Sequence, residues 1–414
     1  SVAGQTVTFF WTDIPLGAVP YTFTFDVTVD ATITPGQTFL NVADLGWSTL
    51  PGPNPNERTY ADSDSAEVVS SSTTLRDPAK SLVVTSESST PDAPPPTLLA
   101  IGEIVRYRLQ AELTEGRFPN LTFVDTLPLG MSFLDPSQVR VSFTSNTAMG
   151  LAPDLAGANN GAIPPTFVLP PGRISLSGQQ VTFDLGTVTN NDNDASAELV
   201  TLEFNVLVDN TLNDNAGDVK SNAFQAFVDG VQYGDTQSVP VRLVEPLIAD
   251  VAKQFVSMSG NQRTFQVSFS NTGTTTAFDT LVTDVIPAGA SLNVGPISVA
   301  LGGGATGAST VGSTPGLLQV TIDEIPVGGT VLIQYSVTLT AASQTGLLNS
   351  VAVTTTSLPG LNGTTVNPTG SSTPGAPGAP NGERTGAGGV NDLADADNET
   401  LGSLGDLVWY DLNG

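Results

Sequence analysis

The sequence predicts an all-β protein made of tandem Ig-like β-sandwich domains in an elongated arrangement. Runs of alternating apolar and polar residues recur along the chain, as between Tyr21 and Val29, and such alternation is typical of strands with one buried face. Windows of helical periodicity are missing, while 42 Gly and 30 Pro separate the short runs. Similar blocks also repeat in a fixed order, which indicates a repeat protein.

The first repeated block is a strand followed by a turn. It occurs as LTFVDTLPLGMSF, which contains Asp125, and as TLVTDVIPAGASL, which contains Asp284. A second block, a pair of strands, occurs three times and is followed each time by a strand that carries an asparagine: Asn41, Asn222 and Asn349. We therefore expect three copies of one sandwich, of which the first is partial.

An acidic segment closes the first and third copies, as NERTYADSDSAEVV from Asn56 and GERTGAGGVNDLADADNET from Gly382. The Gly- and Pro-rich stretch NPTGSSTPGAPGAPNG just before the latter predicts a loop on the domain surface. The predicted units are the C-terminal part of a β-sandwich repeat at 1–77, complete β-sandwich repeats at 78–244 and 245–400, and the truncated start of a different repeat at 401–414.

The composition narrows the possible functions. The chain has 13 Lys and Arg against 40 Asp and Glu, and the resulting charge of −27 repels nucleic acid and anionic membranes. Cysteine and histidine are both absent from it, which removes thiolate nucleophiles, the usual zinc ligands and the commonest general base. Two carboxylates could still hydrolyse a glycoside, but no spacing singles out such a pair. We expect no enzyme activity, and no membrane insertion in this segment.

One unit resembles a known family. The run VTDVIPAGAS, preceded by IADVAKQF and by RTFQVSFSNTGTTTAFDTL, resembles bacterial surface repeats of the domain-of-unknown-function 11 type, which are Ig-like sandwiches of large secreted proteins. The 245–400 unit carries all four parts of that pattern: a lysine strand, an NTG turn, the TD-LPAG-like turn and the asparagine strand. The 78–244 unit departs from it, with Ser86 near the lysine position and LTEGRF in place of the NTG turn.

The last residues resemble a second family. GDLVWYDLNG is similar to the opening of the B-type repeats of serine-aspartate adhesins, a Cna-B-like sandwich whose Asp- and Asn-rich loops bind calcium. Trp409 lies inside this match. Trp11 and Trp47 lie in strand-like or turn contexts, where we expect core packing rather than a ligand platform.

The resemblance also implies a candidate covalent cross-link. Some related adhesin domains form an intramolecular isopeptide bond between Lys and Asn beside a buried carboxylate. The chemistry needs a neutral amine and a protonated acid, and burial shifts both pKa values in those directions. Lys253, Asn349 and Asp284 are the candidate residues here. In the alternative interpretation, Asp284 caps its turn and Asn349 hydrogen-bonds to backbone.

Calcium is the one cofactor that the sequence suggests, because clustered oxygen ligands separated by small residues suit a hard cation. The alternative is a set of solvated acidic loops. The candidate ligands are Asp62, Asp64, Asp192, Asp194, Asp395, Asp397, Asp411 and Asn413.

Taken with the two resemblances, these features predict a structural segment of a large extracellular protein at a bacterial cell surface, acting as a rod, a stalk, or a subunit of a filament or surface layer. The expected partners are copies of the chain or neighbouring repeats of the same polypeptide, including self-assembly in which a strand of one chain completes a sandwich in the next. The alternative is an adhesin module whose loops bind a host or neighbouring-cell protein or a glycan.

Overall fold

The structure is a computed structural model. Its fold confirms the all-β prediction. The structure describes residues 2–3, 5–15, 17, 20–28, 38–69, 74–90, 95–145, 151–155, 157–158, 161–190, 198–340, 348–360, 367–386 and 393–400. These residues form β-strands and two short 3-10 helices, η1 (Pro136–Gln138) and η2 (Pro171–Arg173). No helix in this part of the chain has the length and apolar character needed to cross a membrane.

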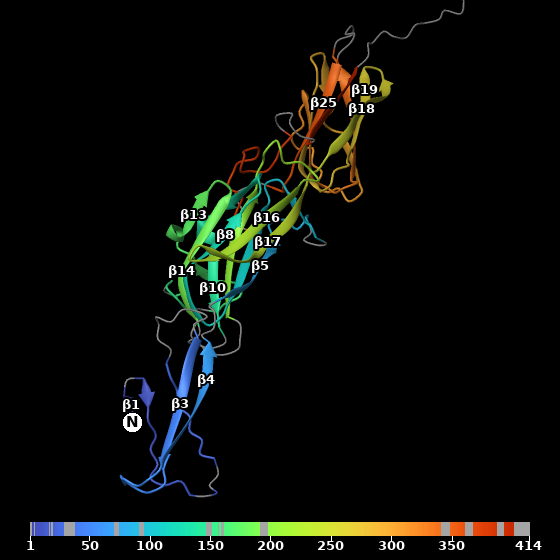
Figure 1. The fold of residues 1–414 in the computed structure, drawn as a ribbon. Coiled ribbons are helices and arrows are strands. Elements are labelled where there is room, and N and C mark those ends of the chain that lie inside the picture. The colour runs from blue at the N-terminus through green and yellow to red at the C-terminus, as the bar shows by residue number, and fades with distance from the viewer. Residues whose placement is uncertain are drawn as a thin grey trace, which may run out of the picture. The chain divides into compact units, whose positions relative to one another are not determined.

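The first compact unit, Ser1–Thr74, holds two antiparallel pairs. The short strands β1 (Val2–Ala3) and β2 (Thr6–Val7) pair with each other. The strand β3 (Thr38–Ser48) pairs along its length with β4 (Thr59–Val69), as Figure 1 shows. We call this second pair the β3–β4 hairpin.

The unit corrects one prediction from the sequence. Trp11 is 37% exposed and Trp47 is 44% exposed, so neither lies in a core. The physical reason is that the described residues of this unit contain no second sheet packed on the β3–β4 hairpin.

The second compact unit begins at Leu75 and contains two β-sandwiches. The sheets of the first sandwich have the strand orders β12-β10-β15-β7-β5, with β9 also paired to β15, and β11-β14-β8-β16-β17-β6, with β13 also paired to β14. Its strands are β5 (Leu75–Thr85), β6 (Thr97–Ala100), β7 (Ile104–Leu113), β8 (Gly116–Thr126), β9 (Met131–Leu134), β10 (Arg140–Thr144), β11 (Leu151–Pro153), β12 (Phe167–Val168), β13 (Ile174–Ser177), β14 (Gln180–Asn190), β15 (Glu198–Val208), β16 (Val219–Val228) and β17 (Val231–Val244).

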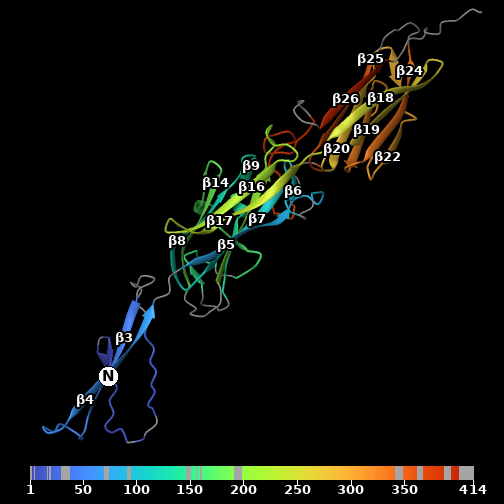
Figure 2. The same ribbon diagram turned by 45° about the vertical axis from the view of Figure 1, so that its right-hand side comes forward.

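The second sandwich has sheets ordered β18-β19-β24-β21, with β22 also paired to β24, and β23-β20-β25-β26. Figure 2 shows β20, β25 and β26 side by side in the latter sheet. Its strands are β18 (Ile248–Ser259), β19 (Gln262–Asn271), β20 (Ala277–Val285), β21 (Ala290–Leu292), β22 (Ser298–Gly302), β23 (Leu317–Ile325), β24 (Thr330–Leu339), β25 (Leu348–Thr356) and β26 (Ala394–Thr400).

The two sandwiches share one topology. The order β5-β7-β15 in the first corresponds to β18-β19-β24 in the second, and β14-β8-β16-β17 corresponds to β23-β20-β25-β26. Each sandwich has its own apolar core, formed by the alternate residues that the period-two pattern predicts. Phe183 and Phe204 meet in the first core at a ring separation of 5.1 Å, and Phe265 and Tyr335 meet in the second at 6.0 Å. Equivalent positions can therefore be compared directly.

The segment 357–386 corrects a second prediction. Its Gly- and Pro-rich part was expected to be a surface loop, yet Thr369, Ser371 and Thr373 are buried against the first sandwich. The Asn205 amide donates to the Thr369 carbonyl at 2.9 Å and to the Ser371 hydroxyl at 2.8 Å. Hydroxyl and backbone groups thus supply this contact, which a search for apolar periodicity does not detect.

Gly102 shows how tightly this segment packs. Its φ is +88°, and a Cβ atom at this position would lie 2.8 Å from the Glu383 Cα atom. Only glycine combines that backbone conformation with so close an approach of another chain segment. We call residues 357–386 the junction segment, because they belong to the second sandwich by sequence and, in their described parts 357–360 and 367–386, contact the first.

Candidate functional site

Lys253 of β18 and Asp284 of β20 meet in the interior of the second sandwich. The two strands belong to opposite sheets, and both side chains are fully buried. The Lys253 ammonium donates a hydrogen bond to Asp284 Oδ2 and lies over the rings of Phe265 and Tyr335. A buried cation paired in this way links the two sheets directly.

Asn349 lies beside this pair on β25, the strand next to β20. Val351 pairs with Asp284, and Asn349 is two residues away on the same face of the strand. The asparagine is fully buried. The structure therefore brings together the three residues that the sequence predicted as an isopeptide site, although the bond itself stays a prediction.

Tyr335 of β24 is a fourth member of the site that the sequence analysis missed. Its hydroxyl donates to Asp284 Oδ2 and accepts a hydrogen bond from the Asn349 amide at 3.3 Å. The signal was present in the alternating run VLIQYSVTL, in which Tyr335 shares the inward face with Val331, Ile333 and Val337. A tyrosine in a buried register position is expected to have a polar partner.

The first sandwich contains an equivalent site, which corrects the interpretation that Ser86 takes the place of the lysine in this unit and that a cross-link is therefore not expected there. Lys80 of β5 donates a hydrogen bond to Asp125 of β8, and both side chains are fully buried. The lysine and aspartate are 45 residues apart here and 31 residues apart in the second sandwich. The extra length accommodates β6 between β5 and β7, so the alignment with the second unit pointed wrongly to Ser86.

Asn222 of β16 completes this second site. It occupies the position of Asn349, because Phe224 pairs with Asp125 and Asn222 is two residues away on the same face. The residue is 1% exposed. Burial raises the pKa values of both Asp125 and Tyr107, and the amide of Asn222 opposes that shift only in part.

The tyrosines of the two sites lie on strands that do not correspond to each other. In the second sandwich Phe265 lies on β19 and Tyr335 on β24, whereas in the first Tyr107 lies on β7 and Phe204 on β15. The Lys80 ammonium lies 4.7 Å from the Tyr107 ring centroid and 5.6 Å from that of Phe204. Both lysines are thus enclosed by one phenol and one phenyl ring with the two positions exchanged.

Burial shifts the ionisable groups of both sites toward their neutral forms. Loss of solvent lowers the pKa of Lys80 to about 8 despite the nearby Asp125, and lowers the pKa of Lys253 despite Asp284. The same cause raises the pKa values of Asp125 and Asp284, against the opposing effect of each lysine. A neutral amine beside a protonated carboxyl group is therefore accessible in each core.

Both sites contain buried polar atoms that have no hydrogen-bond partner in the described structure. Oδ1 of the aspartate and Oδ1 of the asparagine lack one in both sandwiches, and in the first sandwich Nδ2 of Asn222 and the hydroxyl of Tyr107 lack one as well. Buried polar atoms without partners are uncommon and costly. A proton on the aspartate, shared with the asparagine carbonyl, would satisfy both Oδ1 atoms and would polarise that carbonyl.

The proposed calcium ligands have other roles or lie outside the described residues. Asp395 and Asp397 accept hydrogen bonds from the backbone N–H groups of Val251 and Lys253, at 3.1 Å and 2.8 Å. Among the residues that the structure describes, no group of three or more acidic side chains could hold a metal ion. Asp192, Asp194, Asp411 and Asn413 lie outside the described residues. Calcium binding stays a prediction.

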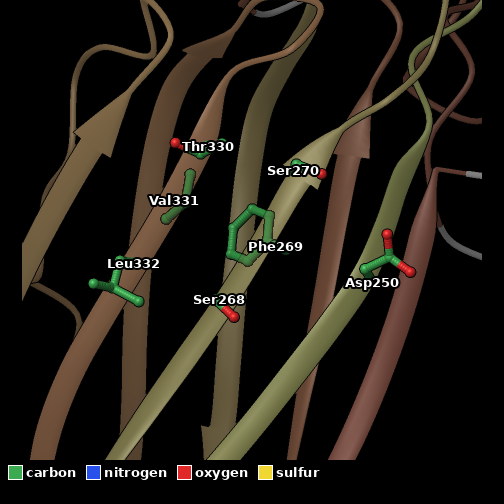
Figure 3. Close-up of a pocket in the computed structure, with 7 residues that line it drawn as sticks. All are labelled: Asp250, Ser268, Phe269, Ser270, Thr330, Val331 and Leu332. Carbon is green, nitrogen blue, oxygen red and sulfur yellow. The ribbon is translucent and has the colours of Figure 1, made fainter.

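A pocket on the second sandwich lies at the ends of β18, β19 and β24. Figure 3 shows its lining residues, Asp250, Ser268, Phe269, Ser270, Thr330, Val331 and Leu332. Asp250 is the one charged residue among them, and the lysine sites are lined by none of these residues. The pocket has no pair of facing carboxylates of the kind that glycoside hydrolysis needs.

Comparison with known proteins gives no family assignment. No family model and no curated protein matches the chain. Among solved structures the chain is similar to one titled BspA_C_mut, with a TM-score of 0.34, 10% identity and coverage of 67% of this chain and 93% of that one. It is also similar to the collagen-binding domain of the Erysipelothrix rhusiopathiae surface protein RspB, with a TM-score of 0.19, 14% identity and coverage of 80% and 96%.

The collagen adhesin of S. aureus gives a comparable match, with a TM-score of 0.21, 12% identity and coverage of 80% of this chain and 96% of that one. Several similar solved structures are thus domains of bacterial surface adhesins. TM-scores of this size are too low to establish a shared fold. The β-sandwich assignment rests on the sheets and registers of this chain.

Tyr335→Phe is expected to slow closure of a Lys253–Asn349 bond by about tenfold while leaving the fold intact, because the lost hydroxyl orients both Asp284 and Asn349. Phe204 occupies the equivalent position of the first sandwich, so a phenyl ring is tolerated there. The measurement is the rate of ammonia loss by intact mass after refolding. An unchanged rate, with the fold confirmed by circular dichroism, would show that the hydroxyl has no positioning role.

Proposed function

We propose that this chain is a load-bearing structural segment of a large protein on a bacterial cell surface, in which each complete sandwich is locked by an internal isopeptide bond. One bond joins Lys80 to Asn222 and the other joins Lys253 to Asn349. The observation that carries the proposal is the recurrence of one buried Lys–Asp–Asn arrangement at equivalent positions of both sandwiches.

The location of the groups supports a mechanical role. Each lysine lies on the edge strand of one sheet, and each asparagine lies on a strand of the opposite sheet. A covalent bond between them would tie the first strand of the sandwich to its penultimate strand. Tension applied along the chain would then pass through that bond and would bypass the strands between the two residues.

The chemistry balances without a cofactor. The neutral lysine Nζ attacks the asparagine Cγ, which forms a C–N bond, while the protonated aspartate gives its proton to the carbonyl oxygen. The aspartate then takes the proton that the new amide nitrogen loses and gives it to the departing NH₂ group. The Cγ–Nδ2 bond breaks, ammonia leaves, and the hydroxyl group returns its proton to the aspartate as the carbonyl re-forms, so the aspartate ends protonated as it began.

The proposal also includes a location of this chain at the cell surface, its relation to the two repeat families, and its structural partners. They are supported by the sequence resemblance of the 245–400 unit and by the strongly acidic, cysteine-free composition. Neighbouring repeats of the same polypeptide are the proposed partners. Calcium is a proposed additional cofactor of the intact protein, bound by its acidic segments.

Force spectroscopy on the full chain, held at its two ends, tests the proposal. We expect unfolding of each complete sandwich to release only the residues that lie outside its cross-link. The variant Asp284→Asn keeps the shape of the side chain and removes the acid, so it should also release the residues between Lys253 and Asn349. Asp323→Asn, an exposed carboxylate on the neighbouring strand β23, is the matched control. Release of the full length of both sandwiches from the unmodified protein would contradict the proposed function.

A further inference from the structure

An extra residue precedes the buried lysine in both sandwiches. The register of β5 against β7 shifts between Arg76 and Ala79, and the register of β18 against β19 shifts between Ala249 and Ala252. In each case the lysine-bearing strand advances three residues while its partner strand advances two. Such an extra residue is a β-bulge. The bulge residues are Asp77 with Pro78 in the first sandwich and Asp250 with Val251 in the second.

The bulge decides which face of the strand the lysine occupies. Leu75 lies in the core of the first sandwich and Ile248 in the core of the second. Lys80 and Lys253 each come five residues later and are also buried. In an unbroken strand, residues separated by an odd number lie on opposite faces, so both lysines would face solvent. The one extra residue returns each lysine to the core.

An aspartate with a left-handed backbone begins each bulge. The φ angle is +46° at Asp77 and +57° at Asp250. Glycine, asparagine and aspartate adopt this conformation more readily than other residues, and a β-branched residue is strongly disfavoured there. Both aspartate side chains are exposed, and Asp250 lines the surface pocket of Figure 3. The contribution of the aspartate is therefore to the backbone of the strand.

The last strand of the opposite sheet holds each bulge, but the two contacts differ. In the second sandwich Asp395 of β26 accepts the N–H group of Val251 at 3.1 Å. The corresponding residue of the first sandwich is Pro78, which has no N–H group to donate. Pro78 packs on Gly234 of β17, where a Cβ atom would lie 2.5 Å from the Pro78 Cγ atom. The feature common to the two sandwiches is therefore the bulge itself.

We propose that Asp77 and Asp250 are positioning residues of the two cross-linking sites. The left-handed backbone of each aspartate makes the bulge that turns the next inward lysine away from solvent and toward the aspartate of the opposite sheet, Asp125 or Asp284. Both residues act through the backbone of the strand and not on the reacting atoms. The effect on bond formation rests on the proposed function, whereas the direction of the lysine side chain does not.

The test measures how fast an N-hydroxysuccinimide ester labels Lys253 in the folded full chain, by peptide mass spectrometry. Every protein compared also carries Asn349→Ala, so that no cross-link conceals the amine. Asp250→Val places a β-branched residue at positive φ and should speed the labelling by about tenfold or more. Asp250→Gly should leave it slow. Gln254→Val is the matched control, because it adds the same side chain at an exposed position of β18 whose φ is negative, and it should also leave labelling slow.

A second measurement follows ammonia loss during refolding of chains that keep Asn349. Asp250→Val should slow the loss from the second sandwich alone. Gly234→Ala, whose new methyl group would press on Pro78, should slow the loss from the first sandwich alone. Each variant thus has the other sandwich as its internal control. If the unmodified chain loses no ammonia, the proposed function fails, while the labelling rates still decide the direction of Lys253.

A folded Asp250→Val chain whose Lys253 stays protected from the ester would overturn the proposal. Rapid labelling of Asp250→Gly would do the same, since it would show that the carboxylate and not the backbone directs the lysine. Circular dichroism verifies the fold of each variant. If Asp250→Val unfolds the second sandwich, Asp250→Ala replaces it, because alanine also disfavours positive φ but adds less bulk.

Discussion

The intact chain is expected to weigh less than its sequence by the mass of two ammonia molecules. Each loss reports one Lys–Asn bond, because the reaction joins the two side chains and releases the amide nitrogen of the asparagine. Both sites have the ingredients in place: a fully buried lysine paired to an aspartate, and a buried asparagine two residues from the partner of that aspartate. Intact-protein mass spectrometry under denaturing conditions measures the loss directly.

Variants assign each loss to its site. Lys80→Met should restore one ammonia mass, Lys253→Met should restore the other, and the double variant should have the mass of its sequence. Peptide mapping should recover a branched peptide that joins Lys253 to Asn349. A chain that keeps its sequence mass after long incubation in the folded state would contradict bond formation in both sandwiches.

We also expect each cross-link to have a large effect on the free energy of unfolding of its sandwich. A cross-link that closes a loop of about 100 residues removes about 4.7 kcal/mol of conformational free energy from the unfolded state. Asp284→Asn should therefore lower the midpoint of thermal unfolding of the second sandwich and leave that of the first nearly unchanged. Calorimetry of the full chain distinguishes the two transitions.

Part of this site could be predicted from sequence because the 245–400 unit resembles a known repeat family. The lysine strand, the turn and the asparagine strand of that pattern identified Lys253, Asp284 and Asn349, and the structure buries all three. The equivalent lysine in the first sandwich could not be placed in that way. Its position depends on the length of the connection that contains β6, and only the fold shows that Lys80 rather than residue 86 faces Asp125.

The contacts of the junction segment with the first sandwich could not be predicted from the alternation of apolar and polar residues either. The segment buries one large apolar side chain, Leu358, against Ala100 and Val244. Most of its other buried groups are hydroxyls, backbone carbonyls and charged side chains, and several of them make polar contacts with residues more than 100 positions away. One signal did exist. The triplet Glu-Arg-Thr occurs in both acidic segments, at 57–59 and 383–385, in a chain with only 13 Lys and Arg residues. A basic residue repeated at one place of so acidic a sequence indicates a specific partner.

That partner is visible for Arg384. Its guanidinium donates to Glu245 Oε1 at 2.5 Å, to the Asp214 carbonyl at 2.8 Å and to Asn210 Oδ1 at 3.1 Å. It also donates to the Thr211 carbonyl. The arginine side chain is 4% exposed and the Glu245 side chain 11%, so the pair is largely removed from solvent. The four contacts attach the junction segment to the end of the first sandwich.

Arg384→Ala is therefore expected to reduce stability by about 3–5 kcal/mol, because it leaves Glu245 buried without its counter-charge and three further acceptors without a donor. Calorimetry should show the transitions of the two sandwiches moving apart, and limited proteolysis should begin to cut within residues 357–386. Arg58→Ala is the matched control, since Arg58 has the same Glu-Arg-Thr context and an exposed side chain.

The combination of Arg384→Met with Glu245→Leu should recover part of the lost stability, because it removes both charges together and fills the space with apolar groups. Recovery would show that the loss of stability in Arg384→Ala comes mainly from the Glu245 carboxylate, which is left buried without its counter-charge. A single arginine variant that unfolds like the unmodified chain and stays resistant to protease would mean that the polar contacts of the junction segment do not couple the two sandwiches.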